Sequence, residues 1–123
     1  MTVRSASRPY RRLPPEPWGR RLLRARVDLS GMTLDEAAEL AGHWMPTTTT
    51  LISRLERSDD VPRGPRSRLR RQLAAVLCHI YWVDPADFDL GPDDLPPGWR
   101  LAERTLGPDG RPCVTDWYRT NAA

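Results

Sequence analysis

The sequence predicts a small, mainly α-helical domain, and three observations lead to this fold class. Thr33 is followed three residues later by Glu36, the spacing of a capping box at a helix start, and apolar residues then recur at helical intervals. Residues 67–82 hold the longest amphipathic repeat of the chain. A length of 123 residues, 39% of them hydrophobic, is enough for one domain with a modest core.

The N-terminal part predicts an arm followed by a helix. Residues 1–17 combine four arginines and four prolines with almost no core-forming residues, which is typical of a flexible, partly polyproline-like basic arm. From Trp18 to Val27, apolar groups recur at helical spacing, including the methylene stem of Arg26. We therefore expect the first helix over these ten residues.

The second helix is predicted over Thr33–Ala41. Its apolar residues recur at helical spacing and are Leu34, Ala37, Ala38 and Ala41. Most of them are small, so another helix can approach this face closely. Gly42 stands where a left-handed residue would end the helix.

The third helix begins in a run of four threonines. β-Branched residues alone would also permit a strand here. Pro46 and Thr47 or Thr48 suit a helix N-terminus, and the spacing of Ile52 and Leu55 continues into a charged, helix-compatible end, so we favour a helix. Its expected apolar face is formed by Thr48, Leu51, Ile52 and Leu55.

A loop rich in proline, glycine and charge over residues 58–67 precedes the fourth and longest helix, expected from Ser67 to Trp82. Its apolar repeat is Leu69, Leu73, Val76, Leu77 and Ile80. Asp84 and Pro85 then predict an N-cap and a proline at the first position of a short helical turn.

The C-terminal part differs in kind. Residues 91–98 are typical of a linker, and the tetrapeptide GPDG at residues 107–110 separates two segments suited to a β-hairpin. An ordered tail without a sheet is the alternative, because the alternation is imperfect. The predicted organisation is a flexible arm (1–17), a helical domain (18–90), and a linker with a hairpin (91–123).

Charge is distributed unevenly along the chain. All nineteen basic residues are arginine, and residues with AT-rich codons are scarce, which indicates a GC-rich bacterial or phage genome. Residues 1–82 carry fifteen arginines and eight acids, whereas residues 83–123 carry four arginines and eight acids. The first two-thirds is therefore the part expected to bind a polyanion.

Several classes of protein are disfavoured. We find no apolar run long enough to span a membrane and no export signal, so we expect a protein of the bacterial cytoplasm, associated with the nucleoid. Cys78 and Cys113 are expected to be ordinary buried or half-buried thiols, with Cys78 in the core. Metal-ligand, phosphate-loop and nucleophile motifs are missing from the sequence, so we expect no enzyme, cofactor, metal or small-molecule substrate.

The order of these pieces resembles the helix-turn-helix of the Cro/repressor family (XRE type) over roughly residues 18–90. The resemblance is carried by residues 34–42 (LDEAAELAG), 52–57 (ISRLER), 73–77 (LAAVL) and 83–88 (VDPADF). It implies a five-helix domain that regulates transcription as a repressor or Cro-like protein. One departure is clear, because Ile52 lies ten positions after Gly42 where family members usually have six. The turn is thus four residues longer, and we expect Trp44 or Met45 to take the core role of the usual apolar turn residue.

The resemblance also implies a set of DNA-contacting residues. The second helix of the pair would lie in the major groove of double-stranded DNA, with loops and helix ends on phosphates. Only Arg54 could make the bidentate guanine contact that discriminates strongly. The implied base-contacting residues are Thr49, Thr50, Ser53 and Arg54, with Thr48 as the N-cap and Arg57 near a phosphate. The sequence itself places a cluster of candidate phosphate ligands in the loop and at the start of the next helix, Arg63, Arg66, Arg68, Arg70 and Arg71. The predicted backbone-contacting residues are therefore Thr48, Arg57, Arg63, Arg66 and Arg68.

Two kinds of protein partner are expected. Proteins with one DNA-reading element commonly bind as two-fold dimers, and the hairpin is the expected interface of a homodimer. Its candidate residues are Trp99, Val114, Trp117 and Tyr118. The alternative function is a protein-interaction module on the same fold, such as an antitoxin or a phage factor that engages a host protein through the acidic C-terminal third.

Overall fold

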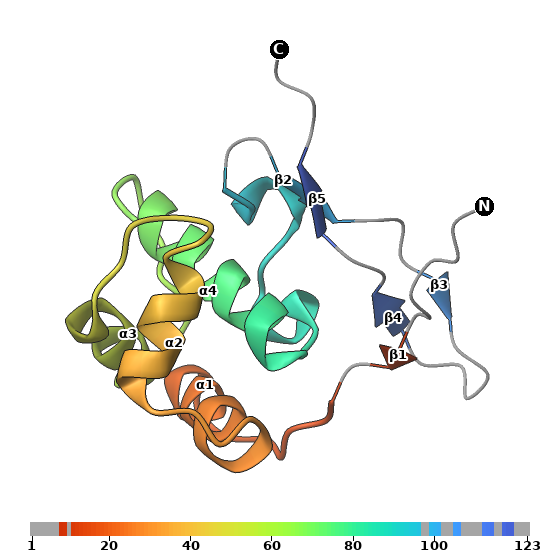
Figure 1. Ribbon diagram of the computed structural model, residues 1–123, viewed down its shortest axis with the longest axis horizontal. Coiled ribbons are helices and arrows are strands. Elements are labelled where there is room, and N and C mark those ends of the chain that lie inside the picture. The colour runs from red at the N-terminus through yellow and green to blue at the C-terminus, as the bar shows by residue number, and fades with distance from the viewer. Residues whose placement is uncertain are drawn as a thin grey trace.

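The computed structural model describes residues 8–9, 11–96, 99–101, 105–106, 112–114 and 117–119. Helices lie on one side and short strands on the other (Figure 1). The α-helices are α1 (Trp18–Arg24), α2 (Leu34–Ala41), α3 (Thr49–Glu56) and α4 (Arg68–Tyr81). The described part of the chain is thus mainly helical, as predicted. The expected fifth helix is a single 3-10 turn, Pro85–Phe88.

The core is built around α4. Both α2 and α3 contact this helix, and α1 contacts α3. Leu73, Val76, Leu77 and Cys78 on α4 are buried, which confirms most of the predicted repeat and the core position of the thiol. Burial raises the pKa of Cys78 well above its usual value, so the thiol is unreactive. Leu69 was expected in the core but is 68% exposed, because it lies in the first turn of α4, beyond the packed helices.

The predicted helix starts are confirmed. The Thr33 hydroxyl accepts a hydrogen bond from the Glu36 amide at 3.1 Å, and the Glu36 carboxylate accepts one from the Thr33 amide at 2.9 Å. Thr48 caps α3 by accepting from the Leu51 amide at 3.3 Å. Asp84 caps the 3-10 turn by accepting from the Ala86 amide at 2.9 Å. Each side-chain oxygen satisfies a backbone N–H that has no partner within its helix.

The end of α2 corrects one expectation. Gly42 has φ −60° and ψ −18°, a right-handed conformation, and is therefore not a left-handed terminator. The backbone instead continues in a helical sense, because the amides of Trp44 and Met45 donate to the Ala41 carbonyl at 2.9 and 3.1 Å. Both side chains are half-buried against the core, as expected for the lengthened turn.

The first helix is longer than predicted. After α1 the chain continues as a five-residue π-helical segment, Ala25–Leu29. The Arg26 side chain is buried, as its place in the apolar repeat indicated, but Val27 is 47% exposed.

The start of α1 meets the end of α3 through backbone atoms. The amides of Trp18 and Gly19 donate to the carbonyls of Asp59 and Ser58 at 3.3 and 2.8 Å. A Cβ on Gly19 would lie 2.5 Å from the carbonyl oxygens of Leu55 and Ser58. These atoms are backbone, so they cannot rotate away, and only glycine permits this approach.

Gly19→Ala is therefore expected to lower the free energy of unfolding by about 1–3 kcal/mol, the usual cost of overpacking. Chemical denaturation would measure it. Gly91→Ala is the control, because a Cβ at Gly91 would meet nothing within 4 Å. Equal stability of Gly19→Ala and the wild type would contradict the close approach.

The boundaries of the helical domain are wider than predicted. Residues 11–17 were expected in a flexible arm, but the Arg11 amide donates to the Trp82 carbonyl at 3.0 Å, and Glu16 pairs with Arg24 at 2.6 Å. Residues 91–98 were expected to be a linker, but Pro92–Asp94 form a 3-10 turn and Leu95 is 8% exposed. Both segments contain many prolines, and their other residues contact helices that are distant in the sequence. Such contacts cannot be predicted from a local sequence pattern.

The strands pair antiparallel, the arrangement that a hairpin around residues 107–110 requires. β2 (Trp99–Leu101) pairs with β5 (Trp117–Arg119), and β3 (Thr105–Leu106) pairs with β4 (Pro112–Val114). β1 (Arg8–Pro9), from the predicted arm, covers the other edge of β4. Trp117 lies opposite Leu101 and Trp99 opposite Arg119, so the two tryptophans are not direct cross-strand partners. The turn itself lies outside the described residues.

Candidate nucleic-acid interface

One face of α3 is open to solvent. Ile52 and Leu55 are buried, whereas Thr50, Arg54 and Arg57 are exposed. These three positions recur at helical intervals, so they form one stripe on the side opposite the core. The other two implied base-contacting residues, Ser53 and Thr49, are half-buried. Ser53 borders the stripe, and Thr49 lies about a quarter turn of the helix away from it. Thr48 is exposed and serves as the N-cap.

The arginines divide into two groups by their partners. Within the described part of the chain, several are engaged: Arg24 with Glu16 and Asp28, Arg26 with Glu56, and Arg71 with Asp94. Others have neither a side-chain hydrogen bond nor an ion pair there, and five of these lie on α3, at its C-cap, just before α4, or in the first turn of α4. They are Arg54, Arg57, Arg66, Arg68 and Arg70.

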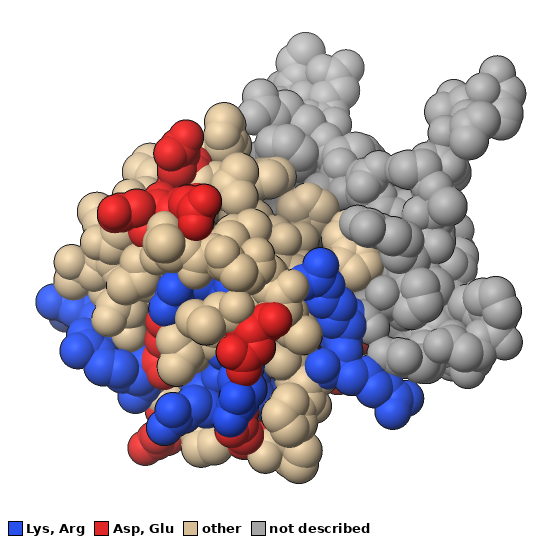
Figure 2. All heavy atoms as spheres, turned by 60° about the horizontal axis from the view of Figure 1, so that its bottom comes forward, with Lys and Arg blue, Asp and Glu red and all other residues tan. Residues whose placement is uncertain are grey.

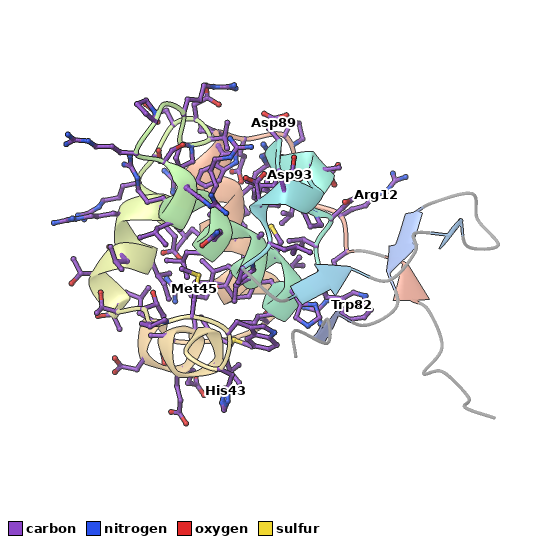
Figure 3. All side chains as sticks on the ribbon, turned by 90° about the horizontal axis from the view of Figure 1, so that it is seen from above. Arg12, His43, Met45, Trp82, Asp89 and Asp93 are labelled. Carbon is purple, nitrogen blue, oxygen red and sulfur yellow. The ribbon has the colours of Figure 1, made fainter. Side chains whose placement is uncertain are left out.

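These five guanidinium groups are exposed. Nitrogen-tipped side chains project from this part of the molecule, away from the strands (Figure 3). In the view of Figure 2, basic and acidic side chains are interspersed over the middle of the helical part, and basic side chains also gather at its left edge. The α3–α4 side therefore carries the concentrated positive charge that a polyanion requires.

The start of α4 is electrostatically unfavourable by itself. Its first turn holds no acidic residue, and Ser67 makes no side-chain cap, because its hydroxyl donates to the Gly64 carbonyl at 2.7 Å. Arg68 and Arg70 thus add positive charge where the helix dipole is already positive. Such an arrangement is destabilising unless an anion approaches, so it favours an anion-binding role for this end of α4.

The start of α2 shows the opposite pattern. Asp35 and Glu36 occupy its first turn, and the capping box satisfies its amides. Glu39 is also exposed one turn later. Negative charge here would repel phosphate, so a nucleic acid would contact α3 and α4 rather than the N-terminus of α2.

Two arginines of the predicted cluster differ from the rest. Arg71 was expected to be a phosphate ligand, but its guanidinium donates to both oxygens of Asp94 at 2.8 and 3.0 Å and to the Pro62 carbonyl at 3.1 Å. Burial opposes ionisation of Asp94, but the hydrogen bonds from Arg71 and the Gly91 amide hold the pKa of that carboxyl below its usual value. Arg71 is therefore a structural residue. Arg63 is exposed and lies 3.6 Å from Asp60.

A groove beside the interface was not anticipated. It has a volume of about 720 Å³ and lies between the α2–α3 turn and the start of α4. Leu51 and Leu69 line it, although the sequence pattern placed both on core-facing stripes. Periodicity placed both leucines on apolar faces but could not show that their side chains are exposed, Leu51 by 37% and Leu69 by 68%.

The predicted dimer residues all lie on strands: Trp99 on β2, Val114 on β4, and Trp117 and Tyr118 on β5. Their side chains are outside the described part of the chain. Val114 pairs with Arg8, so β1 already covers that edge of β4.

The described residues hold no group of three or more histidine, cysteine, aspartate or glutamate side chains placed to bind a metal ion. None of their helices combines the length and the apolarity needed to cross a membrane.

Comparison with known proteins adds no relative: no family model, no curated protein and no solved structure matches the chain.

Proposed function

We propose that this protein is a sequence-specific DNA-binding transcriptional regulator, a repressor or Cro-like protein of the helix-turn-helix type. The observation that carries the proposal is a group of five exposed arginines, on α3, at its C-cap and around the start of α4, whose side chains have no partner among the described residues. Structural arginines in this chain find carboxylates or carbonyls. These five keep their positive charge exposed on one side of the fold, where phosphates could neutralise it.

In the proposed complex α3 lies in the major groove. Thr50, Ser53 and Arg54 face base edges, with Thr49 at the flank, and Arg54 makes the bidentate contact to guanine. The phosphates are contacted at the two ends of α3 by Thr48 and Arg57. They are also contacted by Arg63 and Arg66 from the following loop and by Arg68 from α4. The long α2–α3 turn is compatible with this arrangement, because Trp44 and Met45 anchor it to the core.

We further propose that the protein binds DNA as a homodimer through the strand segments. Pairing of strand edges through Val114 is disfavoured, since β1 occupies that edge. The interface would therefore use side chains of Trp99, Trp117 and Tyr118.

The test is the affinity of the full chain for the DNA upstream of its own coding sequence and for a scrambled duplex. Fluorescence anisotropy at low and physiological salt would measure both. We expect a preference for the upstream duplex that persists at physiological salt, since only non-specific binding consists wholly of phosphate contacts.

Arg54→Ala should weaken binding to the upstream duplex by about 10- to 100-fold and leave the scrambled duplex little changed. Arg20→Ala is the matched control, an exposed arginine on α1 outside the interface. Equal binding of both duplexes, or equal loss in the two variants, would refute base recognition by α3.

A further inference from the structure

The groove between the α2–α3 turn and α4 has a graded lining. Leu73, Gln72 and Pro96 are buried and form its floor, and Trp44 and Met45 are half-buried. Leu51 and Leu69 are 37% and 68% exposed, so they stand at its rim. A volume of about 720 Å³ is enough to receive several bulky side chains.

Exposure of the two leucines to water is energetically unfavourable for the isolated protein. Among the described residues, the exposed large hydrophobic side chains are Val27, Leu40, Leu51 and Leu69, and the last two share this groove. Leu69 exposes the largest fraction of the four. Two leucines at the rim of one concave apolar site indicate a surface that another molecule covers.

The charge around the groove selects the occupant. Arg66, Arg68 and Arg70 contribute to its lining, and within the described residues none of them has a carboxylate partner. Two copies meeting through this groove would bring six guanidinium groups together, so self-association is disfavoured. A nucleic acid would satisfy the arginines, but it would cover leucine, methionine and tryptophan with few apolar atoms.

We propose that this groove binds an acidic, amphipathic polypeptide segment of another protein. Its apolar side chains would pack on Leu51, Leu69 and the floor, and its carboxylates would pair with Arg66, Arg68 and Arg70. The mode is that of an amphipathic segment laid in an apolar groove, with charge determining its specificity.

The test is a selection from a displayed library of random peptides on the full-length protein, with counter-selection on Leu69→Ser. We expect enriched sequences to combine carboxylates with at least two bulky apolar residues. A synthetic peptide from this set should bind Leu69→Ser and Arg70→Glu about tenfold or more weakly than the wild type, since each variant removes one type of contact.

Val27→Ser and Arg20→Glu are the matched controls, because both residues are exposed and lie outside the groove. Both should bind the peptide as the wild type does. The proposal is overturned if no sequence is enriched over Leu69→Ser, if the enriched sequences lack carboxylates, or if the controls lose as much affinity. It is also overturned if the wild type dimerises and Leu69→Ser abolishes the dimer.

One consequence rests on the proposed function. Arg66 and Arg68 belong both to the groove and to the proposed DNA interface, so the peptide should displace duplex DNA. Arg54→Ala should lose affinity for the upstream duplex and bind the peptide as the wild type does, which separates the two proposals. Peptide binding without any DNA binding would refute the regulator and leave the groove proposal standing.

Discussion

Replacing Arg57, Arg66 and Arg68 together by glutamine is expected to weaken binding of duplex DNA by about two to three orders of magnitude at roughly 0.1 M salt. Each phosphate contact releases condensed counterions, so the slope of log affinity against log salt should become shallower by about three. The loss should be similar for the upstream and the scrambled duplex, because phosphates carry no sequence information. Anisotropy titrations across a salt series would measure both quantities.

The structure supplies reasons for choosing these three residues. They are exposed, they have no carboxylate partner within the described part of the chain, and none lies in the core. The triple variant should therefore keep its fold, which circular dichroism would verify. Arg20→Glu is the control for net charge alone. An unchanged salt slope in the triple variant, or an equal change in Arg20→Glu, would show that α3 and α4 are not the phosphate-binding side.

Replacing Arg26 by methionine is expected to lower the free energy of unfolding by about 3–5 kcal/mol. The Arg26 guanidinium donates to both carboxylate oxygens of Glu56 at 2.7 and 3.0 Å and to the Met32 carbonyl at 2.9 Å. The two side chains are only 10% and 7% exposed. The variant leaves the Glu56 carboxylate buried without its partner, and this accounts for most of the loss.

The hydrogen bonds that Arg26 donates to the Glu56 carboxylate raise the pKa of Arg26 despite its burial, so the guanidinium keeps its positive charge. Urea denaturation would measure the loss. Arg24→Met is the matched control, because Arg24 also pairs with carboxylates but its side chain is 43% exposed, so solvent screens its ion pairs and its loss should lower stability far less. Adding Glu56→Leu to Arg26→Met should recover a large part of the loss. No recovery would show that packing, rather than the unpaired charge, determines the effect.

This ion pair also bears on the proposed interface. Glu56 is the last residue of α3, and Arg26 lies in the π-helical segment after α1. Gly19 brings the start of α1 against the same end of α3. Two independent contacts therefore hold the C-terminal end of the helix that would read DNA, while its N-terminal end is left accessible.

Local signals in the sequence determined where most helices begin. The capping box at Thr33 and the caps at Thr48 and Asp84 are short-range hydrogen bonds, made between residues at most three positions apart. Because both partners lie in the same few residues, a sequence pattern contains all the information required. The apolar repeat of α4 is local in the same sense, and it correctly placed Leu73, Val76 and Leu77 in the core.

The tertiary structure alone decided which arginines are available and which leucines are covered. Arg71 and Arg68 belong to one run of basic residues, yet Arg71 is paired with Asp94, twenty-three residues away, while Arg68 has no partner within the described residues. Leu69 and Leu73 belong to one apolar stripe, yet Leu73 is buried and Leu69 is 68% exposed. Periodicity specifies the direction of a side chain, but its partner depends on which distant segment the fold brings there. For that reason the helical fold and the extent of α3 could be predicted from the sequence. The ion pairs of Arg26 and Arg71 and the apolar groove could not be predicted.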